Sequence, residues 1–306
     1  MRRARSHRGI LTASRREVLF GYLFISPWLV GFLVFQLGPI LASVGISLTD
    51  WSLLRPPRFV GLANYRRLAT DPLFFQSLKV TATYTAVSVP LGVVAALLVA
   101  VLLNRAVFGI SFFRTLFYLP TVLAGVGTAV IWGWMFDPNF GVVNYVLSIF
   151  GVRGPDWLAS PEWALPALII MSFWGIGGAI VIFLAALQGV PRALYEAAEI
   201  DGAGRLAKLW YVTIPMISPV ILFNVITGVI SSFQTFTYAY VLTGGGPNYA
   251  TLFYVLYLYE NAFHWFEMGY ASALAWVLFL LIIGLTILIL RLSRAYVHYE
   301  GALRGR

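Results

Sequence analysis

The sequence predicts an all-α integral membrane protein with six transmembrane helices. Of its 306 residues, 60% are hydrophobic and only 11% are charged, whereas a soluble domain carries about a quarter charged residues. Six windows contain no Asp, Glu, Lys or Arg, and each is long enough to cross about 30 Å of hydrocarbon. These windows are residues 18–49, 80–104, 115–136, 163–191, 209–259 and 268–290.

Prolines and short connecting segments shape the predicted spans. Pro39, in "LGPI", is expected to break or kink the outer part of the first window. The following segment "NYRRLATDPLFFQSL" can form a short amphipathic helix along the membrane surface. Between the third and fourth windows, Gly141 to Phe150 can form another short helix with an apolar face. Prolines within several spans favour a multi-helix bundle that contains a pathway.

The fifth window is long enough to raise the question of a seventh span. Its apolar part, Met216 to Leu242, ends at the breaker cluster "TGGGPNY". The remaining "ATLFYVLYLY" has about ten residues before Glu260, which is too short to span. We therefore interpret it as an interfacial or periplasmic helix, and the predicted count stays at six.

The distribution of basic residues predicts that both termini lie in the cytoplasm. With that orientation the inside segments hold 15 of the 21 Lys and Arg residues, and the outside segments hold the remaining 6. The domains are then a basic cytoplasmic tail (1–17), a six-helix transmembrane domain (18–292) and a cytoplasmic C-terminal tail (293–306). The basic tail could bind RNA or resemble a transit peptide, but anchoring against membrane lipid explains the net charge of +9 without nucleic acid.

No catalytic or metal-binding motif stands out in the sequence. The chain has no cysteine, which excludes disulfides and thiolate metal sites. His264 lies near Glu260 and Glu267, and an interfacial histidine is favoured there over a metal ligand. The chain has no P-loop and no Ser/His/Asp set. We expect no metal, no bound cofactor and no catalytic site.

The segment of residues 188–215, "QGVPRALYEAAEIDGAGRLAKLWYVTIP", is unusually polar for this chain. It predicts a helix from Arg192 to Asp201, a glycine turn at Gly202 and Gly204, and a second helix from Arg205 to Thr213. Small alanines permit close approach of another surface, and a glutamate offers a carboxylate to a basic partner. An amphipathic loop resting on headgroups is the alternative, but three acidic residues disfavour it, because anionic headgroups attract Lys and Arg.

This segment resembles the EAA motif of permease subunits in binding-protein-dependent ATP-binding-cassette (ABC) importers. It departs from that motif at Leu206, often an aromatic, and at Ala207, often glutamine. The likeness extends to "FVGLANYRRL", "RTLFYLP", "GVVNYVL", "LTGGGPNYAT" and "YVHYEG", and it is specific to the carbohydrate branch that includes maltose and glycerol-3-phosphate importers. The matching positions of the motif are Glu196, Ala197, Ala198, Asp201, Gly202, Ala203 and Pro215.

The resemblance implies the fold, the partners and the role of the loop. It implies the type I importer permease fold in a bacterial or archaeal cytoplasmic membrane, with half of the translocation pathway in this chain. The implied partners are a second homologous permease, two ATPase subunits that bind ATP and Mg, and an extracytoplasmic solute-binding protein. Glu196 would pair with a basic group of the ATPase, and Gly202 would keep the turn.

The fifth window carries a polar stripe that predicts a pathway or a helix-packing surface. Its members recur at spacings of 4, 3, 4 and 3, which is one face of a helix. Packing alone would also use small and polar residues, but the resemblance favours the pathway. Hydroxyls and an indole suit a neutral, hydroxyl-rich solute. The candidate residues are Asn224, Gly228, Ser231, Ser232, Thr235 and Tyr238, with Trp174, Gly175 and Gly178 of the fourth window.

The function indicated is ATP-driven import of an oligosaccharide, a polyol or a glycerol-phosphate compound. The lack of Lys and Arg in the stripe disfavours a phosphorylated solute but does not exclude one. The alternative is a secondary transporter driven by an ion gradient, which normally needs an ionisable group within its spans. A membrane enzyme is disfavoured by the missing catalytic set. The energy dependence of transport separates these classes.

Overall fold

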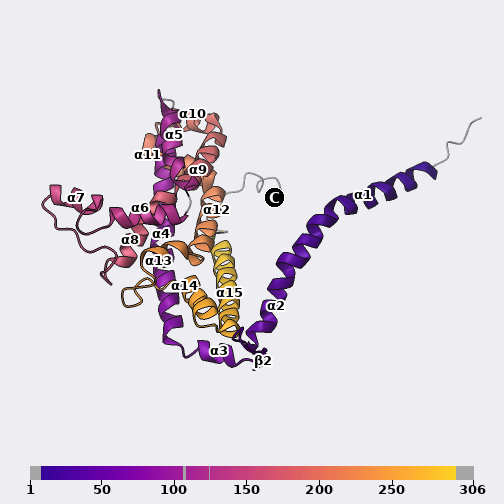
Figure 1. Cartoon of the computed structure of the whole chain (residues 1–306). Coiled ribbons are helices and arrows are strands. Elements are labelled where there is room, and N and C mark those ends of the chain that lie inside the picture. Colours follow the sequence, from indigo (N-terminus) through magenta and orange to yellow (C-terminus); the bar gives the residue numbers. More distant parts are fainter. Residues whose placement is uncertain (1–7, 106–107, 124, 294–306) are drawn as a thin grey trace, which may run out of the picture.

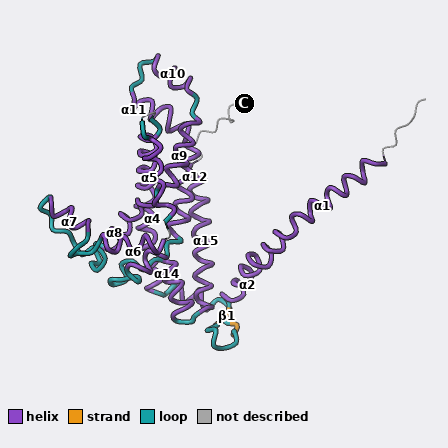
Figure 2. Tube along the Cα trace, turned by 45° about the horizontal axis from the view of Figure 1, so that its top comes forward, coloured by secondary structure: helices purple, strands orange, loops and turns teal. Residues whose placement is uncertain are grey.

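The computed structural model describes residues 8–105, 108–123 and 125–293, with side chains from residue 15 onward. Most of the described chain is helical (Figures 1 and 2). Two strands of two residues, β1 (Thr49–Asp50) and β2 (Arg58–Phe59), pair antiparallel. Residues 1–7 of the predicted N-terminal tail, all of the predicted C-terminal tail except Ser293, and the segment "YVHYEG" lie outside the described residues.

Four described helical stretches are long and apolar enough to cross a membrane unbroken, namely Arg15–Ser47, Pro72–Leu103, Arg205–Phe233 and Met268–Ser293. Two further spans are bent pairs. Ile110–Val122 meets Gly125–Met135 at 103°, and Ala164–Gly175 meets Gly177–Gly189 at 46°. Counting each bent pair as one span gives the six that the sequence predicts.

The first span stands apart from the bundle (Figure 1). It consists of α1 (Arg8–Phe32), the π-helical η1 (Leu33–Leu37) and α2 (Gly38–Ser47). The predicted irregularity at Pro39 is this π-helical turn, since proline has no N–H to donate to the preceding turn. Only α2 packs on the bundle, against α15 (Met268–Ser293), where Trp276 Nε1 donates to Ser43 Oγ at 3.0 Å.

The remaining helices form the bundle. The second span is α4 (Pro72–Leu103), and it packs extensively on the fourth and fifth. The third contains α5 (Ile110–Tyr118), the 3-10 helix η2 (Leu119–Val122) and α6 (Gly125–Met135). The fourth contains α8 (Ala164–Ser172), the 3-10 helix η3 (Phe173–Gly175) and α9 (Gly177–Gly189). A Cβ on Gly177 would lie 2.4 Å from the Phe117 carbonyl oxygen, so only glycine permits this close approach of α9 to the third span.

The fifth span differs from the prediction at both ends. The short α11 (Arg205–Lys208) continues through the π-helical η4 (Leu209–Thr213) into α12 (Ile214–Phe233), so the loop helix and the span are one helix. The span ends at Phe233, not at the predicted Leu242. After Phe233 the amides of Gln234 and Thr235 donate to carbonyls three residues back, at 3.2 Å each, in place of the bonds four residues back that would continue the helix. The short α13 (Thr237–Leu242) follows the break.

Two short connecting helices also lie differently from the prediction. The amphipathic surface helix is confined to α3 (Ala63–Leu68), because Asp71 caps a new helix that begins with Pro72. The span α4 therefore starts eight residues earlier than its charge-free window. The short helix predicted between the third and fourth spans is present as α7 (Val142–Ile149), which projects from the bundle (Figure 1).

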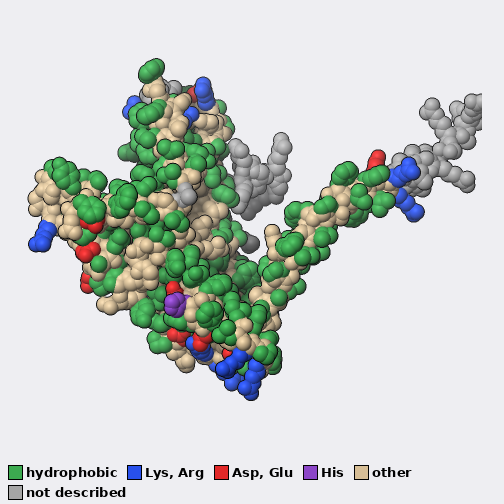
Figure 3. Space-filling model, viewed as in Figure 1, with side chains coloured by type: hydrophobic (Ala, Val, Ile, Leu, Met, Phe, Trp, Pro, Cys, Tyr) green, Lys and Arg blue, Asp and Glu red, His purple; other side chains and the backbone are tan. Residues whose placement is uncertain are grey.

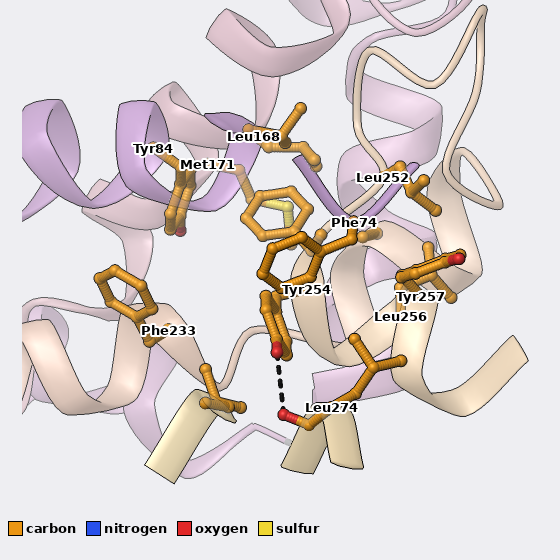
Figure 4. Close-up of a cluster of buried hydrophobic side chains, with 14 of the residues drawn as sticks. Phe74, Tyr84, Leu168, Met171, Phe233, Leu252, Tyr254, Leu256, Tyr257 and Leu274 are labelled. Atoms are coloured by element: carbon orange, nitrogen blue, oxygen red, sulfur yellow. Dashed lines mark hydrogen bonds between the residues drawn. The ribbon is translucent and has the colours of Figure 1, made fainter. Parts of the chain in front are cut away.

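The segment predicted to be an interfacial or periplasmic helix forms α14 (Tyr254–Tyr259), which is too short to span, as predicted, and is buried among the other helices (Figure 4). Tyr254 is fully buried, its amide donates to Thr81 Oγ1 at 2.9 Å and its hydroxyl donates to the Leu274 carbonyl at 2.8 Å. The helix thus joins α4 to α15. Its sequence "YVLYLY" carries no charged face to keep in water, so burial is favoured. The π-helical η5 (Glu260–His264) follows it.

Basic and acidic side chains gather at the two ends of the bundle (Figure 3). At the α3 end, Arg67 pairs with Glu267 at 2.8 Å and lies over the ring of Tyr270, 4.2 Å from its centroid. The ring hydroxyls of Tyr257 and Tyr270 both donate to Asp71. Burial opposes ionisation of Asp71, but these hydrogen bonds and those from the backbone amides outweigh it and lower its pKa.

Replacing Asp71 with alanine should destabilise the bundle by about 2 kcal/mol or more, because a helix cap is lost and two tyrosine hydroxyls lose their acceptor. Thermal unfolding of the purified protein measures this. Since the folded pKa of Asp71 is lowered, its charge stabilises the protein above the ordinary aspartate pKa, and that contribution disappears as pH falls through the lowered value. Asp137→Ala, which removes an acceptor of backbone amides only, is the control; an equal loss would contradict the tyrosine contribution.

Candidate functional sites

A cavity of about 430 Å³ lies inside the bundle, between α4, the fourth span and α12. Among its described lining residues none is charged. Gly178, on α9, is the one predicted pathway residue that does not line it. The other eight do, and they are Trp174, Gly175, Asn224, Gly228, Ser231, Ser232, Thr235 and Tyr238.

The five residues of the polar stripe, Asn224, Gly228, Ser231, Thr235 and Tyr238, do not all share one helix face as their spacing predicts. That prediction is wrong beyond Phe233, because α12 ends there and Thr235 lies in the break. Tyr238 belongs to α13. The chain bends so that both still reach the same cavity. The break lies next to the polar lining of this cavity, and irregular backbone at membrane depth is tolerated where it lines such a cavity.

Internal hydrogen bonds divide the polar lining into two groups. Asn224 Nδ2 donates to the Val220 carbonyl at 2.9 Å, and Ser232 Oγ donates to Thr85 Oγ1 at 2.8 Å. Both residues are buried. Ser231 and Trp174 are exposed, so these two are the predicted residues best placed to contact a solute.

Gly228 fits both roles considered for the polar stripe, which are lining a pathway and packing helices together. It lines the cavity, and a Cβ at this position would lie 3.1 Å from Val89 Cγ1. A side chain there would contact Val89 of α4 so closely that the Val89 side chain would have to shift by a few tenths of an ångström. Packing and cavity lining therefore coincide at this residue rather than exclude each other.

The lining also contains polar residues that the sequence reasoning missed. They come mainly from α4, η2 and the end of α8, where the hydroxyl of Tyr84 interacts with those of Ser172 and Thr235. The recurrence of hydroxyls within the second window, three to four residues apart, was a signal that could have found the α4 members. The missed residues are Tyr84, Ser88, Thr121, Thr128 and Ser172.

An aromatic row holds the indole of Trp174 at the cavity wall. Its ring packs edge-on against Trp132 with 5.8 Å between centroids, and Trp132 contacts Phe136 at 5.0 Å. Phe136 in turn packs on Trp157 at 5.5 Å. Trp132 and Trp157, which composition alone would place in an interfacial belt, are buried in this row.

The second candidate site is the loop at the α10 end of the bundle. α10 (Arg192–Ile200) ends in the predicted glycine turn. Gly202 has φ +79°, its amide donates to the Glu199 carbonyl at 3.0 Å, and the Ala203 amide donates to the Ala198 carbonyl at 2.8 Å. These two bonds form a Schellman motif, which satisfies the last carbonyls of the helix.

The predicted EAA residues sit on and around this turn. Glu196, Ala197, Asp201 and Gly202 are exposed. Ala198, Ala203 and Pro215 are half-buried, and Pro215 lies in the first turn of α12. Within the described residues Glu196 has no ion-pair partner. Its neighbour Glu199 pairs with Lys208 Nζ at 2.5 Å, an interaction that ties α10 to α11 and that the sequence reasoning missed.

Replacing Gly202 with alanine should loosen this turn, since a left-handed conformation costs a residue with a side chain about 1 kcal/mol. No atom lies within 4 Å of the new Cβ, so no steric clash adds to that cost. Hydrogen exchange of the Ala203 amide should rise about fivefold. Gly204→Ala is the control, because Gly204 has an ordinary φ of −69° and equally open space; equal acceleration in both variants would contradict the prediction.

His264 and its acidic neighbours do not converge. His264 Nδ1 lies 3.7 Å from Glu260 Oε2, while Glu267 pairs with Arg67. In the described part of the chain, no three His, Asp or Glu side chains are grouped so that they could hold a metal ion.

Six apolar spans around a polar cavity, with a helical loop exposed at one end, define a membrane transport subunit. The chain belongs to the family described as binding-protein-dependent transport system inner membrane component, whose model matches residues 78–298. The predicted family is thereby confirmed.

Its relatives include sugar ABC transporter permeases. The chain is 43% identical to the probable ABC transporter permease protein YesP of Bacillus subtilis (strain 168), over 94% of each chain. It is 34% identical to the trehalose/maltose transport system permease protein MalF of Thermococcus litoralis, over 91% of this chain and 95% of that one. It is 38% identical to the lactose transport system permease protein LacF of Rhizobium radiobacter, over 88% and 92%.

A solved structure shares the fold. A chain in the crystal structure of a bacterial alginate ABC transporter, in complex with an alginate pentasaccharide-bound periplasmic protein, matches with a TM-score of 0.80. It is 23% identical, and the match covers 94% of this chain and 98% of that one. The predicted type I importer permease fold is confirmed.

Proposed function

We propose that this chain is the permease of a carbohydrate importer and that its uncharged cavity forms half of the translocation pathway. The cavity carries the proposal, because its hydroxyls can hydrogen-bond a sugar and the Trp174 indole can stack on the apolar face of the ring. The names of the relatives, which include trehalose/maltose and lactose transport permeases, support the same substrate class. A neutral oligosaccharide or polyol fits this lining better than a phosphorylated solute.

The loop at the α10 end is the proposed contact with the ATPase subunits, which bind ATP and Mg in place of this chain. The exposed, unpaired carboxylate of Glu196 is available to a basic partner. Ile200 and Leu206, 87% and 74% exposed, add apolar surface for the partner to cover. The Schellman turn and the Glu199–Lys208 pair fix the loop to α11 and hence to α12. A displacement of the loop would therefore move α12, which forms part of the cavity wall.

A second, homologous permease completes the proposed pathway. The cavity is open, and α1 stands off the bundle with every described side chain but one exposed. A companion chain would cover both. With the α10 loop on the cytoplasmic side, both termini lie in the cytoplasm of a bacterial or archaeal cell. The solute-binding protein then docks at the opposite end, around α3 and α7. No observation favours the secondary-transporter alternative.

The test is ATP hydrolysis by the purified complex of both permeases and the ATPase subunits in nanodiscs, with its binding protein and a panel of sugars, polyols and glycerol phosphates. We expect one neutral carbohydrate, loaded on the binding protein, to stimulate hydrolysis. Uptake into proteoliposomes should follow ATP and survive collapse of the proton gradient. Stimulation by a solute of another class would overturn the carbohydrate proposal, and uptake that stops with the proton gradient would overturn the ATP-driven one.

A further inference from the structure

A second cavity, of about 510 Å³, lies at the α10 end of the bundle, behind the loop. It is separate from the uncharged cavity between α4, the fourth span and α12, and the two cavities share no lining residue. Its walls come from the end of α4, from Leu187 of α9, and from α10, α11 and η4.

Three cationic side chains line this cavity: Arg105, Arg205 and Lys208. Lys208 is paired with Glu199 and its side chain is only 20% exposed. Among the described residues, neither Arg105 nor Arg205 takes part in an ion pair. Two guanidinium groups and an ammonium facing one space repel each other, and an anion between them would relieve that repulsion.

The rest of the lining suits a phosphate group. Asn104 supplies an exposed amide group, while the hydroxyls of Tyr195 and Thr213 lie 3.0 Å apart and are engaged with each other and with the Lys208 carbonyl, 3.2 Å from Thr213 Oγ1. Guanidinium groups match phosphate oxygens in a bidentate geometry. Val101 and Leu187, which belong to spanning helices, provide an apolar wall on the membrane side of the cations.

We propose that this cavity binds a phosphate group, supplied by the headgroup of an anionic phospholipid of the adjacent leaflet. Arg105 follows the end of α4, and Arg205 and Lys208 lie in the first turn of the spanning stretch Arg205–Phe233, so all three are at the ends of spans, where lipid headgroups lie; basic pockets between helices bind such lipids. Because the cavity is walled by α10 and α11, a bound lipid would brace the loop. Under the proposed function the loop contacts the ATPase, so the lipid would also tune coupling.

The binding test is native mass spectrometry of the full complex in neutral detergent with added phosphatidylglycerol, against phosphatidylethanolamine as the zwitterionic reference. Arg105→Gln with Arg205→Gln should weaken retention of phosphatidylglycerol at least about tenfold. Arg291→Gln, at the last turn of α15 and outside the cavity lining, is the matched control and should retain it. Val101→Phe, which fills the cavity without changing charge, should reduce retention as the arginine variants do.

Calorimetric titration of the lipid-free complex with inorganic phosphate distinguishes the two sources of the group. Binding of phosphatidylglycerol that the cavity variants lose supports the lipid. Binding of inorganic phosphate with no preference for phosphatidylglycerol keeps the phosphate site but overturns the lipid as its source. Retention equal to the parent in the arginine variants or in Val101→Phe, or an equal loss in Arg291→Gln, overturns the site. These readouts need no transport, so they are independent of the proposed carbohydrate import.

Discussion

Replacing Glu196 with lysine should abolish binding-protein-stimulated ATP hydrolysis and solute uptake while leaving the fold intact. The side chain is exposed on α10 and has no ion-pair partner in the described chain, so its loss removes no internal contact. If Glu196 pairs with a basic group of the ATPase, a lysine would place two positive charges against each other. Truncating one partner of a buried interfacial pair costs about 2–5 kcal/mol, so a reversal should lower coupled hydrolysis at least about 30-fold.

The measurement is ATP hydrolysis by the reconstituted complex with and without loaded binding protein, followed by uptake into proteoliposomes. Glu17→Lys makes the same charge change on an exposed residue of α1, away from the loop, and should behave as the parent. Size-exclusion chromatography confirms that the variant permease folds and inserts. Transport at the parental rate by Glu196→Lys would remove this residue from the coupling contact.

The loop could be predicted from the sequence because its signals are local. Gly202 is needed where a left-handed residue ends α10, and the acids and alanines before it follow helical spacing. The break after Phe233 could not be predicted in the same way. Charge-free composition continues across Gln234 to Phe236, and hydropathy does not register the change to backbone bonds three residues back that ends α12.

Burial was the other property that the sequence did not reveal. α14 was interpreted as an interfacial or periplasmic helix because it is too short to span, and nothing local indicates that Tyr254 bonds to partners 173 and 20 residues away in the chain. Contacts of that kind depend on the whole bundle. Only part of the cavity lining could be predicted, for the same reason. α12 supplies a periodic polar stripe, whereas Tyr84 and Ser88 line the cavity only because α4 packs alongside α12.

Replacing Ser231 with tryptophan should block uptake almost completely while leaving binding-protein-stimulated ATP hydrolysis in place. Ser231 is exposed and lines the uncharged cavity, so a large ring there takes up space without displacing the buried bonds of Asn224 or Ser232. By contrast, Ser231→Ala removes one hydroxyl and should slow uptake only about twofold to tenfold, the value of one hydrogen bond. The difference between the two variants measures obstruction rather than lost recognition.

Phe223→Trp enlarges an exposed residue of the same helix that does not line the cavity, and it should transport as the parent does. The two main variants should therefore fail in opposite ways: Glu196→Lys loses stimulated hydrolysis, whereas Ser231→Trp keeps hydrolysing ATP without moving solute. Parental uptake by Ser231→Trp would mean that the solute passes through the companion chain, and the cavity would lose its assigned role. Loss of hydrolysis in the same variant would instead mean that this wall moves with the loop, since α11, η4 and α12 form one continuous helix between them.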